Sequence, residues 1–143
     1  MQYEILEHPA DLKIRAYGKD LPELFSHTIK GMFESCRPTI SDKTIIEREI
    51  KISAEGGSAS GGKADSLENL LVDFLSEALY LSDINDEVYL DADFQILTDK
   101  ELKGKIRGQK VTGLDIEIKA VTWHDLEIKK EGEQWQATVL FDI

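Results

Sequence analysis

Residues 65–80 read DSLENLLVDFLSEALY, and this stretch decides the fold. Its apolar side chains recur at helical spacing and form the broadest stripe in the chain, made by Leu67, Leu70, Leu71, Phe74, Leu75, Ala78 and Leu79. We predict that Asp65 caps this helix, with Glu68 in the capping-box position. A stripe this wide must be buried against another layer, so we expect a central core helix.

A second helix is predicted upstream, between Asp20 and Pro38. Asp20 and Glu23 have capping-box spacing, Pro22 suits a first helical turn, and Pro38 ends the helix. Most other regular structure reads as strand, at residues 3–6, 12–17, 44–55, 88–97, 102–111, 115–128 and 135–143, with a hairpin turn at 130–133. We therefore predict a single α+β domain over residues 1–143, with mixed or antiparallel β-sheet layers packed on two main helices.

The charge balance excludes two classes of partner. The 143 residues carry 17 Lys and Arg against 28 Asp and Glu, a formal net charge of −11. Direct nucleic-acid binding through phosphate neutralisation needs a basic surface, as does an anionic membrane. The single cysteine, Cys36, excludes an intrachain disulfide, and no apolar run is long enough to span a bilayer. We expect a cytoplasmic protein.

The glycine-rich stretch before the central helix resembles a nucleotide-binding loop only in part. Gly57, Gly62 and Lys63 have the spacing of a phosphate-binding loop, but Ala64 stands where a hydroxyl would hold Mg²⁺. The carboxylate of Asp65 would also repel phosphates at the helix start. We predict a flexible Gly/Ser loop at 56–63 and keep nucleotide binding as an alternative.

No nucleophile stands out in the sequence. Cys36 falls on the apolar stripe of the first helix, which favours a small buried hydrophobe. His124 and Asp125 are neighbours on a predicted strand, where adjacent side chains face opposite ways, so we expect no local dyad and a partly buried histidine. Asp91 and Asp93 place two acids on one strand face.

Carboxylates are the more informative group. The last strand alternates apolar residues with Asp142 on the opposite face, and Ile143 adds a terminal carboxylate one residue later. If Asp11 is adjacent, three anionic groups converge, and they would repel one another unless a cation or basic group neutralised them. Oxygen ligands favour Ca²⁺ or Mg²⁺ over Zn²⁺. A solvated strand end is the alternative.

Four segments in order along the chain resemble the archease family. They are EHPAD at 7–11, LLVDFLSEALY at 70–80, IKAVTWHDL at 118–126 and LFDI at 140–143. Pro9 and Trp123 stand where Thr and Tyr are common in that family, and both changes look tolerable. The four motifs together span the chain and are specific, whereas any one of them would be weak evidence.

The resemblance implies a protein cofactor rather than an enzyme. Archeases assist the RtcB-type tRNA-splicing RNA ligase by promoting its guanylylation and multiple turnover, so tRNA is contacted only through the ligase. The family also implies a metal site of Asp11, Asp142 and the terminal carboxylate of Ile143, with Ca²⁺ as the first choice and Mg²⁺ or Mn²⁺ as alternatives. His8 and His124 are candidates for a supporting role.

Two questions stay open at this point. The alternative function is a calcium-binding structural or chaperone-like domain that modulates a tRNA-modifying enzyme. A homo-oligomer is compatible with everything above, and the surface that meets the ligase is not identified. Our hypothesis is that the acidic tip formed by Asp11, Asp142 and Ile143 enters or borders the ligase active site, while catalysis stays with the ligase.

Overall fold

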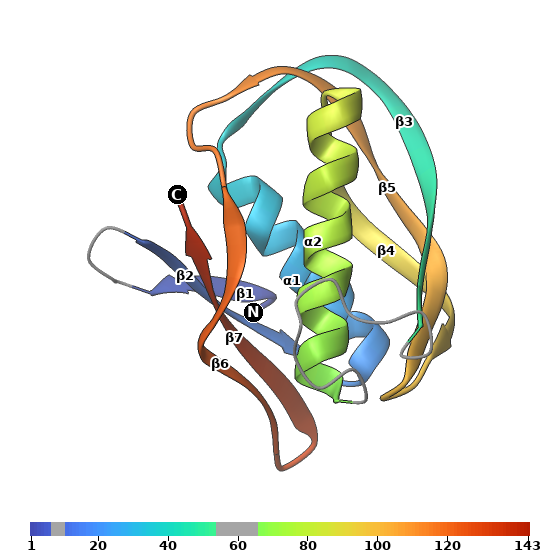
Figure 1. The fold of residues 1–143 in the computed structure, drawn as a ribbon, viewed down its shortest axis with the longest axis vertical. Coiled ribbons are helices and arrows are strands. Elements are labelled where there is room, and N and C mark those ends of the chain that lie inside the picture. The colour runs from blue at the N-terminus through green and yellow to red at the C-terminus, as the bar shows by residue number, and fades with distance from the viewer. Residues whose placement is uncertain (7–10, 54–65) are drawn as a thin grey trace.

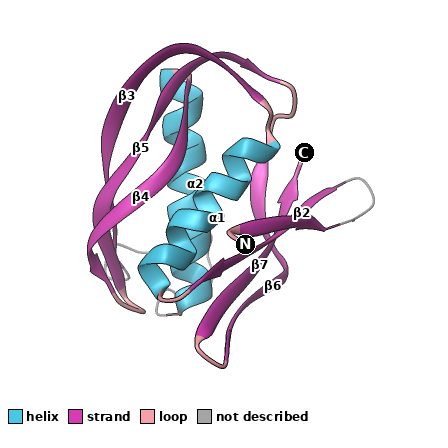
Figure 2. Ribbon diagram, turned by 180° about the vertical axis from the view of Figure 1, so that it is seen from behind, coloured by secondary structure: helices cyan, strands magenta, loops and turns pink. Residues whose placement is uncertain are grey.

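Two antiparallel sheets enclose two helices. The computed structural model describes residues 1–6, 11–53 and 66–143. The elements are β1 (Tyr3–Leu6), β2 (Asp11–Gly18), α1 (Leu21–Ser35), β3 (Pro38–Ser53), α2 (Leu67–Asn85), β4 (Glu87–Leu97), β5 (Glu101–Leu114), β6 (Ala120–Glu131) and β7 (Gln134–Asp142). One sheet has the order β1-β2-β7-β6 and the other β3-β5-β4, with the helices between them (Figures 1 and 2). The predicted α+β class is confirmed.

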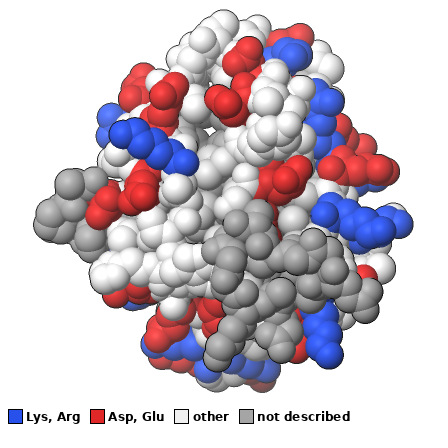
Figure 3. All heavy atoms as spheres, viewed as in Figure 1, with Lys and Arg blue, Asp and Glu red and all other residues white. Residues whose placement is uncertain are grey.

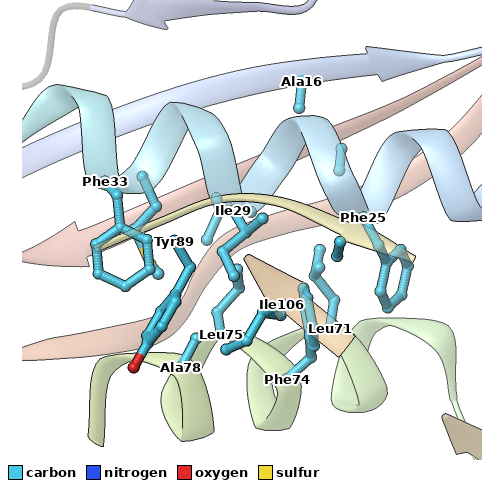
Figure 4. Packing of buried hydrophobic residues seen from close by; sticks show 14 of the residues in the cluster. Ala16, Phe25, Ile29, Phe33, Leu71, Phe74, Leu75, Ala78, Tyr89 and Ile106 are labelled. Carbon is cyan, nitrogen blue, oxygen red and sulfur yellow. The ribbon is translucent and has the colours of Figure 1, made fainter. Parts of the chain in front are cut away.

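The helices fill the space between the sheets with large apolar side chains. Leu71, Phe74, Leu75 and Ala78 of α2 are fully buried, as the stripe in this segment predicts. They meet the buried face of α1, where the rings of Phe25 and Phe74 lie 5.7 Å apart (Figure 4). Such aromatic pairs add stabilisation beyond the area that they bury.

One of the two helix caps differs from the sequence prediction. The Asp20 side chain accepts a hydrogen bond from the backbone N–H of Glu23 at 2.9 Å, as predicted. At α2 the cap is Ser66, whose hydroxyl accepts from the N–H of Asn69 at 3.1 Å, so the prediction of Asp65 is wrong by one residue. Asp and Ser are both favourable N-cap residues, so the sequence alone could not show which of these two neighbours caps the helix.

The starts of β3 and β6 differ most from the predicted strand bounds. β3 begins at Pro38 rather than at residue 44, because its first residues pair irregularly with the end of β5. β6 begins at Ala120 rather than at residue 115. The N–H groups of Asp115 and Ile116 both donate to the carbonyl of Cys36, at 3.0 and 3.1 Å, and this contact with the end of α1 replaces strand pairing.

Candidate functional site

The predicted acidic tip lies where the first long strand meets the last. In the antiparallel pairing of β2 with β7, Asp11 is the cross-strand partner of Asp142. On its other side, Asp142 pairs with Ala120 of β6. Directly opposed residues in an antiparallel ladder project from the same face of the sheet, so the two carboxylates share one face.

The hydrophobic pattern of the two strands dictates this register. Ile14 and Ala16 of β2 are fully buried, and they pair with Val139 and Ala137 of β7, which are fully buried too. A slip of one residue would turn every one of these side chains to the opposite face. The juxtaposition of Asp11 and Asp142 therefore follows from core packing three and five residues away along the two strands.

Two carboxylates in direct opposition destabilise a strand pair unless a positive charge lies near them. Their oxygen atoms suit a hard divalent cation. Among residues 1–6, 11–53 and 66–143, the side chains of His, Cys, Asp and Glu form no group of three that could hold a metal ion. The third residue predicted for this site, Ile143, directly follows Asp142 in the chain.

A bulge in β6 places further charges on this sheet. Pairing with β7 breaks between Thr122 and Glu127, and Asp125 adopts a left-handed backbone with φ 58°. Its carboxylate lies 3.4 Å from the Lys13 ammonium and 3.6 Å from Nε2 of His124. Two predictions are therefore wrong here. The bulge turns His124 outward, with 71% of its side chain exposed, so it is not partly buried, and His124 does contact Asp125, although we expected no local dyad.

Several sequence predictions lie outside the described residues. His8 and the loop at 56–63 fall in the two segments that the structure does not describe. The nucleotide-binding alternative through Gly57, Gly62 and Lys63 therefore stays a prediction, as does the flexibility of that loop.

Cys36 is a small buried hydrophobe, as predicted. Its side chain is 1% exposed, and its thiol donates to the carbonyl of Met32 at 3.4 Å. Burial raises the pKa of the thiol to about 11. Because the thiolate is the reactive form, this cysteine is protonated and unreactive at neutral pH.

Sequence reasoning missed a buried ion pair that crosses the second sheet. Glu87 is fully buried and accepts hydrogen bonds from Arg48, at 2.9 and 2.7 Å, and from the Tyr89 hydroxyl at 2.7 Å. Burial raises the pKa of Glu87, but these hydrogen bonds outweigh it and leave the pKa below its ordinary value. No short-range signal links residues 39 apart on separate strands.

The predicted acid pair on β4 has a structural partner. The Arg107 guanidinium donates to Asp91, to Asp93 and to Glu47 on the exposed face of the β3-β5-β4 sheet. One guanidinium thus bridges three carboxylates from the two flanking strands, which is a structural use of the pair rather than a ligand site.

A groove runs along the C-terminal half of α2. We call it the α2 groove; it has a volume of about 900 Å³ and lies between α2 and the chain from the end of β5 to the start of β6. Its described lining includes Phe33, Cys36, Val72, Leu79, Tyr80, Asp83, Asp86, Leu114, Glu117, Lys119, Val121 and Trp123. Figure 3 shows this side of the molecule, with acidic side chains and some basic ones around a largely uncharged hollow beside the upper half of α2.

Within the described ranges, no helix has the length and apolar content needed to cross a membrane.

A model of the Archease protein family (MTH1598/TM1083) matches residues 3–143.

Curated relatives match over nearly the whole chain. The archease protein of Methanosarcina barkeri is 35% identical over 150 residues, which are 99% of this chain and 96% of that protein. That of Pyrococcus furiosus is 33% identical, covering 99% of each.

Two solved structures have the same fold. Protein 1598 of Methanobacterium thermoautotrophicum superposes with a TM-score of 0.64 at 27% identity, covering 99% of this chain and 98% of that one. An archease of Thermotoga maritima, described as a possible chaperone, has a TM-score of 0.65 at 20% identity, covering 96% and 94%.

Proposed function

Because the chain belongs to the archease family, we propose that it activates an RtcB-type tRNA-splicing RNA ligase by promoting guanylylation and multiple turnover of that enzyme. The protein is a cofactor in this proposal, and the bond-making chemistry belongs to the ligase. The observation that supports it is the cross-strand pair of Asp11 and Asp142, which puts two motifs from opposite ends of the sequence at one point.

The acidic tip is the proposed working end. Asp11, Asp142 and the terminal carboxylate of Ile143 would hold a divalent cation, with Ca²⁺ preferred and Mg²⁺ or Mn²⁺ as alternatives. A bound cation supplies positive charge that can organise phosphate oxygens. The residues of this chain hold the carboxylates on a rigid sheet, so the tip can reach a ligase active site with little loss of conformational entropy.

The charge balance suits a protein partner that handles RNA. A chain with a net charge of −11 repels RNA but is attracted to a basic surface, which steers association. Contact with tRNA is therefore proposed only through the ligase.

Single-turnover guanylylation of a cognate ligase tests the proposal. We expect the wild-type chain to accelerate the reaction, and Asp11→Asn and Asp142→Asn each to lower the stimulation by about tenfold or more, as for lost metal contacts. Asp99→Asn is the matched control, because it removes the same charge from an exposed turn on the other sheet. It should stimulate like the wild type.

The alternative is a calcium-binding structural or chaperone-like domain, in which a cation only ties β2 to β7. It predicts a Ca²⁺-dependent rise in melting temperature that Asp11→Asn abolishes, with no effect on any ligase. Folded tip variants that stimulate the ligase in full would refute our proposal.

A further inference from the structure

The α2 groove has apolar residues at its base, and the charged residues of its described lining are mainly acidic, with Asp83, Asp86 and Glu117 against the single cation Lys119. Phe33, Val72 and Val121 contribute to the base, and their side chains belong to the core or pack against it. Asp83 and Glu117 are exposed and line the groove from α2 and from the segment before β6. This composition suits a ligand with an apolar body and positive flanks.

Two aromatic side chains remain exposed at this groove. Tyr80 of α2 is 58% exposed and Trp123 of β6 is 39% exposed, and both line it. Large aromatic residues left at the surface of a concave region that is lined by both polar and apolar groups are typical of the central contacts of protein interfaces.

The groove leads to the acidic tip. Ala120 lines it, and Ala120 is also the cross-strand partner of Asp142. One lining residue of the groove, Ala120, is therefore separated from Asp142 by one strand spacing, on the order of 5 Å.

We propose that the α2 groove is the docking site for a segment of the ligase in which one or more bulky apolar side chains are flanked by Lys or Arg. The apolar side chains enter between α2 and β6, and the basic ones pair with Asp83, Asp86 and Glu117. Docking there sets the distance from the ligase to the acidic tip. This inference rests on the proposed function, since it names the surface by which that partner is held.

Charge reversal of the acidic lining tests the groove directly. We expect Asp83→Lys combined with Glu117→Lys to raise the dissociation constant for the ligase by about tenfold or more, because attractive pairs become repulsive. The control is Glu49→Lys combined with Glu133→Lys, which changes the net charge equally at exposed sites on β3 and in the β6–β7 turn. The control should bind within about twofold of the wild type.

Binding and stimulation measurements distinguish the α2 groove from the acidic tip. Groove variants should bind weakly yet stimulate guanylylation in full once the ligase is saturating, whereas Asp11→Asn should bind normally and fail to stimulate. Groove variants that bind like the control overturn the groove inference and leave the tip proposal standing. A wild-type chain that neither binds nor stimulates the ligase overturns both.

Cross-linking identifies the occupant. A photo-reactive phenylalanine analogue in place of Tyr80 should attach to a ligase peptide that contains a bulky apolar residue beside Lys or Arg. Attachment instead to RNA, or to a second copy of this chain accompanied by a dimer in sedimentation, would overturn the assignment of the groove to the ligase.

Discussion

Two acidic residues of this chain have different neighbours across their strands. Glu87 is buried against the Arg48 guanidinium and the Tyr89 hydroxyl, so its charge is compensated inside the fold. Asp11 instead faces Asp142, a second carboxylate, across the strand pair. A charge compensated inside the fold contributes to stability, whereas two carboxylates aligned on one face of a strand pair favour the binding of a cation or of a basic group.

At the residue scale, Glu87→Gln should lower the free energy of unfolding by about 1–3 kcal/mol at neutral pH, because two donors lose a charged acceptor. The pKa of Glu87 lies below its ordinary 4.5 in the folded chain, so its contribution is complete above that value. It is lost as pH falls through the lower, native pKa. Urea unfolding from neutral pH down to acid should therefore show a shallower acid loss in the variant than in the wild type.

Glu49→Gln is the control for this experiment, because Glu49 is an exposed acid on β3. It should change stability by less than about 0.5 kcal/mol. Equal effects of the two substitutions would show that the buried pair does not contribute more than a surface charge.

At the element scale, the strand pattern predicted where chain segments are but not their irregularities. The sequence predicts one strand at residues 115–128, whereas the structure has a break in its pairing between Thr122 and Glu127. The left-handed Asp125 and its contact with Lys13 depend on which strand lies alongside, which no local pattern records. The exposed position of His124 could not be predicted for the same reason.

The β4–β5 pair contains a glycine that no other residue can replace without strain. A Cβ atom at Gly108 would lie 1.6 Å from the carbonyl oxygen of Val88 and 2.6 Å from its carbon. We expect Gly108→Ala to destabilise the fold by about 3 kcal/mol, at the upper end for overpacking, because backbone cannot move aside. Gly113→Ala on the same strand meets nothing within 4 Å and should be near neutral in urea denaturation.

At the scale of the whole molecule, the class of fold was predictable and the strand order was not. Two amphipathic helices and several strands specify an α+β layer structure, which the two sheets confirm. The order β1-β2-β7-β6 joins strands more than a hundred residues apart, and such pairings are set by shape and packing across the entire core. Strand patterns alone therefore could not predict that Asp11 lies beside Asp142. That prediction needed the family resemblance, together with the argument that these carboxylates would converge if Asp11 lay next to the last strand.

The acid excess should weaken the fold at low ionic strength. A net charge of −11 repels itself, and salt at about 0.15 M screens charges over roughly 8 Å. We expect the melting temperature to rise by a few degrees as sodium chloride increases from about 10 mM to about 150 mM. Choline chloride should act equally, because screening does not depend on the cation. A fall in melting temperature would show that surface ion pairs such as those of Arg107 dominate.

The central place of β7 also has a consequence for synthesis on the ribosome. β2 is made early, but one of its two neighbours, β7, consists of residues 134–142. Since a chain emerges from its N-terminus, the β1–β2 pair carries an open hydrogen-bonding edge for most of translation. Nascent chains should therefore be prone to mispairing until their last strand is added. A premature stop before residue 134 removes β7, the strand that joins β2 to β6 in this sheet.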